Sequence, residues 1–130
     1  MSGTASINAM VSVVHAIGHV IGPRFHLQHG VPHAMLLAPA LRRLLPAIGG
    51  DARYVLEALG CAVDGTVDDA AGALSELLNR LPLPQRLRDV GIQSDDITAI
   101  AGATMSDYMM ANLAAPMRQT DVESLLLDAW

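Results

Sequence analysis

The chain has 130 residues, of which 52% are hydrophobic, so it can bury the core of one domain. A formal net charge of −5 and scattered arginines exclude a nucleic-acid binder, because such proteins need clustered positive charge. No apolar run is as uniform as the roughly 20 residues of a membrane-spanning helix, so we expect no membrane segment. A single cysteine, Cys61, excludes an internal disulfide, and without an export signal pattern we expect a cytoplasmic protein.

The first half of the chain is predicted to form three helices, over residues 2–21, 31–45 and 52–59. Gly22-Pro23 should end the first helix, because proline donates no backbone hydrogen bond and restricts the residue before it. Pro39 falls inside the second helix, which should bend or pack tightly there. Asp51 is the expected cap of the third helix.

The second half is predicted to form three more helices, over residues 66–81, 94–113 and 122–130. Thr66 or Asp68 should begin the first of these, and Ser94 should cap the second. Thr120 and Glu123 have the spacing of a capping box, in which hydroxyl and carboxylate satisfy each other's backbone N–H groups. The last helix should therefore begin just after Thr120.

The pattern of apolar residues favours helices throughout. Leu74, Leu77 and Leu78 recur at helical spacing and should face the core. The stretch 94–113 is either one helix or two helices broken near Ser106. Nothing alternates with a period of two for long, so the fold class is all-α, a multi-helix bundle in a single domain over residues 1–130.

All five histidines lie between His15 and His33, in the run HAIGHVIGPRFHLQHGVPH. Imidazole suits borderline divalent metals such as zinc, iron, nickel and copper. His15 and His19 stand four apart, so on a helix their side chains project from one face about one turn apart. His29 and His33 have the same spacing across the predicted start of the next helix. The turn between the helices could bring both pairs together, whereas His26 is expected to be a surface or turn residue.

The run HAIGHVIGPRFHLQHGVPHAMLLAPAL resembles the metal-site segment of iron-containing (group III) alcohol dehydrogenases. Those proteins carry an HxxxH helix, a turn, and a further histidine followed by an apolar helix. The later stretches LPLPQRLRDVGIQSDDITAIA and TDVESLLLDAW are similar to the closing helices of the same family. Within the family, the second histidine at His33 makes the segment most similar to the maleylacetate reductase branch.

The resemblance implies roles for four histidines. The first histidine of HxxxH and the histidine after the turn ligate the family's metal, which implies metal ligation by His15 and His29. The second histidine of HxxxH lies beside substrate and nicotinamide, which implies a catalytic role for His19. His19 and His33 are also candidates to complete the ligand set, because a site needs at least three protein ligands. The implied cofactor is a divalent metal, iron or zinc.

Members of the family begin with a nucleotide-binding domain, whose glycine-rich loop and further aspartate and histidine ligands do not occur in this sequence. The resemblance therefore implies the C-terminal part of the family's helical domain, with no NAD(P) site in this chain. We expect it to be inactive alone. Oxidation or reduction would need a separate nucleotide-binding chain as partner.

Two functional interpretations stay open at this point. In the first, the chain is a metal module of an NAD(P)-dependent oxidoreductase, completed by a partner. In the second, it is a non-catalytic helical oligomerisation module, and its histidines are hydrogen-bonded core residues. Apolar surface that would face a second domain predicts a homodimer in either case.

Overall fold

Six α-helices make up most of the computed structural model, which describes residues 12–113 and 115–130. The helices are α2 (Val13–Arg24), α3 (Gly30–Leu44), α4 (Ala52–Ala58), α5 (Val67–Leu78), α6 (Ile97–Met105) and α7 (Gln119–Ala129). Short 3₁₀ helices connect them: η1 (Leu45–Asp51), η2 (Leu87–Val90), η3 (Ser94–Asp96) and η4 (Tyr108–Asn112). The described residues contain no strand, which confirms the predicted all-α class.

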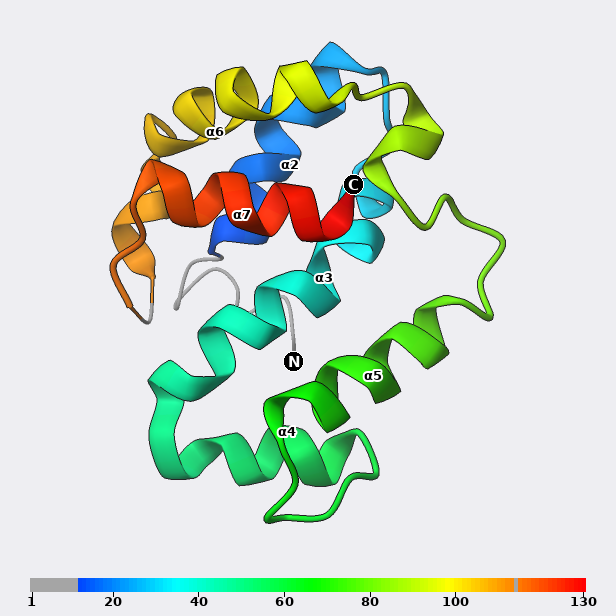
Figure 1. Cartoon of the computed structure of the whole chain (residues 1–130), viewed down its shortest axis with the longest axis vertical. Helices are drawn as coiled ribbons and strands as arrows, with labels where there is room; N and C mark the ends of the chain where they lie inside the picture. Colours follow the sequence, from blue (N-terminus) through cyan, green and yellow to red (C-terminus); the bar gives the residue numbers. More distant parts are fainter. Residues whose placement is uncertain (1–11, 114) are drawn as a thin grey trace.

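Helix α3 connects the two halves of the fold (Figure 1). It packs against α2 and α7 on one side and against α5 on the other. The main core lies among α2, α3, α6 and α7, where Ile17, Leu36, Ile100 and Leu125 are fully buried. A smaller cluster joins η1, α4 and α5 through Leu45, Leu56 and Ala70, and Cys61 is partly buried against it. The position of α3 therefore depends on both clusters.

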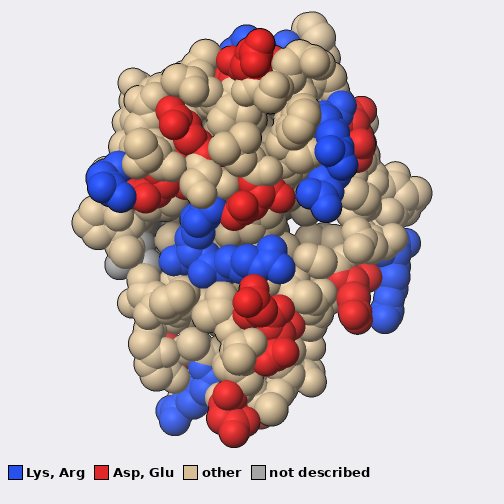
Figure 2. Space-filling model, viewed as in Figure 1, with Lys and Arg blue, Asp and Glu red and all other residues tan. Residues whose placement is uncertain are grey.

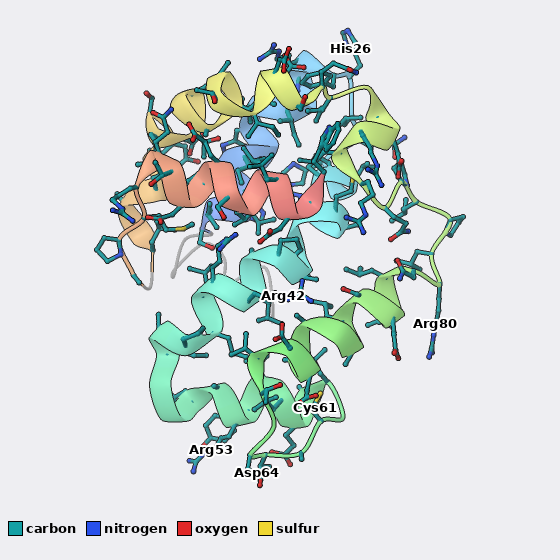
Figure 3. All side chains as sticks on the ribbon, in the orientation of Figure 1. His26, Arg42, Arg53, Cys61, Asp64 and Arg80 are labelled. Atoms are coloured by element: carbon teal, nitrogen blue, oxygen red, sulfur yellow. The ribbon has the colours of Figure 1, made fainter. Side chains whose placement is uncertain are left out.

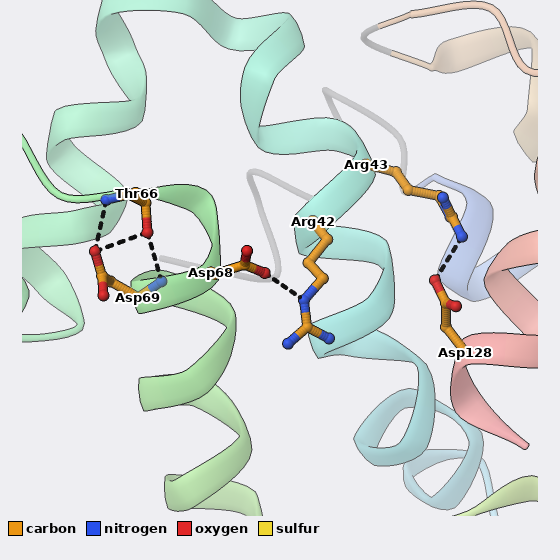
Figure 4. Close-up of polar contacts among 6 residues, drawn as sticks. All are labelled: Arg42, Arg43, Thr66, Asp68, Asp69 and Asp128. Carbon is orange, nitrogen blue, oxygen red and sulfur yellow. Dashed lines mark hydrogen bonds and ion pairs between the residues drawn. The ribbon is translucent and has the colours of Figure 1, made fainter.

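Two ion pairs also join α3 to its neighbours (Figure 4). Arg42 Nε donates to Asp68 of α5 over 2.9 Å, and Arg43 Nη2 donates to Asp128 of α7 over 2.5 Å. Figure 2 shows a band of basic side chains across the middle of the molecule, with acidic side chains on both sides of it. Exposed pairs of this kind add little stability, so burial of apolar side chains is what holds α3 in place.

The prediction that Gly22-Pro23 ends the first helix is wrong. Helix α2 continues to Arg24, and the Phe25 N–H still donates to the Ile21 carbonyl over 2.9 Å. Proline removes only its own N–H from the ladder, and in the last turn this loss does not stop the chain from completing the helix. The predicted start near residue 2 lies outside the described residues, and the described helix begins at Val13.

Three of the predicted caps are also wrong. Asp51 has helical backbone angles and makes no capping bond, and α7 begins at Gln119 rather than after Thr120. At the 3₁₀ turn before α6, the N-cap is Gln93 instead of Ser94. Only Thr66 caps as predicted, with its hydroxyl oxygen accepting from the Asp69 N–H over 3.1 Å.

An aspartate three residues after the N-cap accounts for the starts at Gln93 and Arg118, although not for the one at Asp51. In four elements the carboxylate accepts a hydrogen bond from the backbone N–H of the N-cap residue, whatever that residue is. The pairs are Asp69 with Thr66, Asp89 with Arg86, Asp96 with Gln93, and Asp121 with Arg118. The carboxylate also lies favourably at the positive end of the helix dipole.

The remaining sequence expectations divide between confirmed and wrong. The stretch 94–113 is broken at Ser106, as one alternative predicted, and Pro39 is buried within α3. Leu74 is buried, but Leu77 is 53% exposed and does not face the core. In the part of the chain that the structure describes, no helix has the length and apolarity required to cross a bilayer.

Candidate metal centre

Three of the predicted histidines meet where α2 packs against α3. His15 comes from the first turn of α2, and His29 and His33 come from the start of α3. The ring centroid of His33 lies 4.1 Å from that of His15 and 4.6 Å from that of His29, and His15 and His29 are 5.5 Å apart. One nitrogen from each ring lies within 4.8 Å of the other two. The spacing of the histidines in sequence is thus converted into a three-imidazole cluster.

Gly18 lets the two helices approach closely enough for this cluster to form. A Cβ atom added at Gly18 would lie 3.3 Å from Cε1 of His33, a contact tighter than side chains normally make. The ring of His33 thus occupies space that any larger residue at position 18 would need. The glycine therefore belongs to the site although it offers no ligand atom.

The hydrogen bonding of His33 leaves one nitrogen free. Its Nδ1–H donates to the His29 carbonyl over 2.6 Å, since a carbonyl can only accept. Nε2 then carries a lone pair, is buried, and has no hydrogen-bond partner among the described residues. Leaving a buried polar atom without a partner costs the folded state about 1–3 kcal/mol. The lone pair of this nitrogen is therefore suited to binding an electrophile such as a metal ion.

The protonation of the cluster favours the form that binds metal. Burial lowers the pKa of His15, and the neighbouring rings of His33 and His29 lower it further. Burial also lowers the pKa of His33, although its bond to the His29 carbonyl opposes this shift. Both effects favour neutral imidazole, which is the ligand form.

These residues fit a divalent metal. An imidazole ligates zinc over about 2.0–2.1 Å, and three such ligands with one open position are a known catalytic arrangement. The bond from the His33 Nδ1–H to a backbone carbonyl matches the outer contact that usually orients a ligating histidine. Iron and zinc both accept imidazole nitrogen. His15, His29 and His33 would hold the ion.

His19 lies outside this group of three and has a different partner. Its Nδ1 is 2.9 Å from Oδ2 of Asp107, which stands between α6 and η4. The sequence carries no signal for Asp107, because 88 positions separate it from His19 and no motif links the two residues. His26 is exposed, with a left-handed backbone at φ 54°, which agrees with its predicted place in a turn. Figure 3 shows it at the edge of the molecule.

An open groove of about 630 Å³ lies beside the cluster. His19 and His29 both line it, together with Gly18, Gly22, Pro23, His26 and Leu27. A second hollow of about 240 Å³, between α3, α5 and α7, contains no histidine. A ligand in the first groove would therefore reach both His19 and one member of the three-histidine cluster.

Replacing Gly18 with alanine tests the geometry of the cluster. The new methyl group should displace the His33 ring and weaken binding of Zn²⁺ about 10-fold, the scale of a disturbed outer contact. The measurement is calorimetric titration of the chain with Zn²⁺. Gly72→Ala is the matched control, because a Cβ in the middle of α5 meets nothing within 4 Å. Equal affinities in the two variants would contradict a role for Gly18.

The structure is an all-α domain in which three imidazoles lie together. The family described as Fe-containing alcohol dehydrogenase family, C-terminal, matches residues 1–130. The chain therefore belongs to the Fe-containing alcohol dehydrogenase family, through its C-terminal domain, as the resemblance implied.

Relatives and solved structures agree with this assignment. Lactaldehyde reductase of Escherichia coli K12 is 30% identical over 135 residues, which cover 100% of this chain and 35% of the relative. The 1,3-propanediol dehydrogenase of Citrobacter freundii is 32% identical over 82% of this chain and 29% of its own length. The structure of an alcohol dehydrogenase from Oenococcus oeni superimposes with a TM-score of 0.88 at 25% identity, over 98% of this chain and 35% of that one. The chain thus spans about a third of the length of these relatives.

Proposed function

We propose that this chain is the metal-holding helical part of an oxidoreductase that acts on small alcohols or aldehydes. His15, His29 and His33 bind one divalent ion, iron or zinc. The observation that carries this proposal is the buried Nε2 of His33, which has no hydrogen-bond partner within residues 12–113 and 115–130 and lies beside two further imidazoles. The substrate class is supported by the names of two relatives, a lactaldehyde reductase and a 1,3-propanediol dehydrogenase.

Different residues of the chain would hold the metal ion and contact the substrate. A bound divalent ion polarises an alcohol or carbonyl oxygen as a Lewis acid. The groove beside His29 receives the substrate, and His19 lines the same groove as the candidate catalytic residue. Hydride transfer also requires nicotinamide, which a nucleotide-binding domain or a separate chain would hold.

The finer assignments of the sequence analysis stay predictions. His33 was the reason for favouring the maleylacetate reductase branch, and the relatives reported above have other names. The homodimer, the separate nucleotide-binding partner and the cytoplasmic location likewise stay predictions. The alternative, a non-catalytic association module, would draw on the exposed large apolar side chains, among them Tyr54, Val63, Leu77 and Leu127. It leaves the unpartnered Nε2 of His33 without an explanation, so we favour the metal site.

Titration of the chain with Zn²⁺, and with Fe²⁺ under anaerobic conditions, tests the proposal. We expect one ion per chain, and we expect the affinity to fall as the pH falls, because protons compete for the same nitrogens. The control is His26→Asn, which removes an exposed histidine and keeps a residue that tolerates the left-handed backbone. Absence of saturable binding, or loss of the site in the control, would overturn the proposal.

A further inference from the structure

Asp107 joins His19 from a distant part of the chain. The side chain of Asp107 is 14% exposed and that of His19 is 36% exposed, with 2.9 Å between Oδ2 and Nδ1. Helix α2 and η4 pack together here, and the ring of Tyr108 lies 6.2 Å from the ring of His19. Packing thus places the pair, and His19 also lines the groove.

Both oxygens of Asp107 are engaged. Oδ1 accepts the backbone N–H of Met109 over 2.8 Å, and Oδ2 faces His19. Burial alone would raise the pKa of Asp107, but the Met109 N–H and the His19 ring lower the pKa below its ordinary value. Asp107 is therefore an ionised carboxylate with no proton to donate.

The carboxylate determines where the His19 ring carries its proton. An ionised carboxylate can only accept, so the donor in this bond is Nδ1–H of His19. A neutral ring with its proton on Nδ1 has a lone pair on Nε2. Because Nδ1 is committed to Asp107, Nε2 is the nitrogen left for the groove that His19 and His29 line.

We propose that Asp107 is a positioning residue that holds His19 in the Nδ1–H tautomer, so that Nε2 accepts a hydrogen bond or a proton from a hydroxyl group bound in the groove. This inference rests on the proposed function for the identity of that hydroxyl, which belongs to a small alcohol. The tautomer of His19 does not depend on the proposed function, because it follows from the contacts of Asp107 alone. A carboxylate that orients the imidazole base in this way is a recurring device in catalysis.

A second contact between an aspartate and α2 involves no histidine. Arg24 Nη2 donates to Oδ1 of Asp96 over 2.6 Å, and Oδ2 of Asp96 accepts the Gln93 N–H over 3.0 Å. Asp96 and Asp107 thus each accept one backbone N–H and one side chain of α2, but the side chain that Asp107 contacts is an imidazole. Asp96→Asn is therefore a matched control for loss of anchoring without loss of the histidine partner.

The test is the tautomer of His19, read from the ring-nitrogen resonances of the ¹⁵N-histidine-labelled, metal-free chain at alkaline pH, where imidazole is neutral. Wild type should show the proton on Nδ1. In Asp107→Asn, the Met109 N–H should retain the amide oxygen, so the amide NH₂ faces His19 and the ring proton should move to Nε2. Asp96→Asn should leave the His19 resonances unchanged.

Several outcomes would overturn the inference. A proton on Nε2 of His19 in the wild-type chain would overturn it, whether or not any variant folds. The inference would also be overturned if Asp107→Asn left the His19 tautomer unchanged, or if Asp96→Asn moved the His19 proton to Nε2. Zn²⁺ titration of Asp107→Asn separates this inference from the proposed function, because His15, His29 and His33 are intact and affinity should match wild type. A chain that shows the predicted tautomers but binds no metal would support the role of Asp107 and overturn the metal site.

Discussion

His15→Ala should lower the affinity for Zn²⁺ by more than about 100-fold, beyond the loss expected for an outer contact. His15 is the only member of the three-histidine cluster that comes from α2. Without it, His29 and His33 remain as two imidazoles on one turn of α3, and a protein metal site needs at least three ligands. The measurement is calorimetric titration, supported by the amount of metal retained after dialysis.

The control for His15→Ala is again His26→Asn, which changes a histidine in the same segment that lies outside the cluster. The thermal unfolding of the metal-free proteins should be compared as well, since a misfolded variant would also lose the ion. An affinity for Zn²⁺ that His15→Ala leaves within a few-fold of wild type would exclude the cluster as the binding site.

Leu36→Ala should destabilise the folded chain by about 3 kcal/mol and lower the midpoint of thermal unfolding by roughly 10 °C. Leu36 is fully buried in α3, among side chains of α2, α6 and α7. Truncation removes apolar burial and leaves a cavity that a close-packed core cannot fill completely. Helix α3 also presents His33 one turn earlier, so the cluster should loosen with it.

Leu37→Ala is the matched control, because it makes the same substitution one residue later on a side chain that is 41% exposed. Its effect on the free energy of unfolding should stay below about 1 kcal/mol, since little burial is lost. Urea denaturation at fixed pH gives both values. Equal destabilisation by the two substitutions would show that α3 does not depend on the buried face that the structure assigns to it.

Much of the site could be predicted from the sequence because its geometry is local. His15 lies on one helix, His29 and His33 lie on the next, and the short turn between those helices leaves few ways to separate them. The three-histidine cluster was therefore within reach of spacing rules. The helix starts are harder to predict, because the N-cap residues Gln93 and Arg118 are not typical capping types, and Asp96 and Asp121 bond back to them instead.

The sequence alone determined the all-α class, the order of the helices and the histidine segment, since these follow from periodicity and from glycine and proline turns. Only the tertiary structure showed which contacts each histidine makes. It placed His33 over Gly18, it gave His19 a partner 88 positions away, and it left Leu77 outside the core. The physical reason is that such contacts depend on how whole helices dock, and docking is decided by the summed packing of many side chains rather than by local spacing.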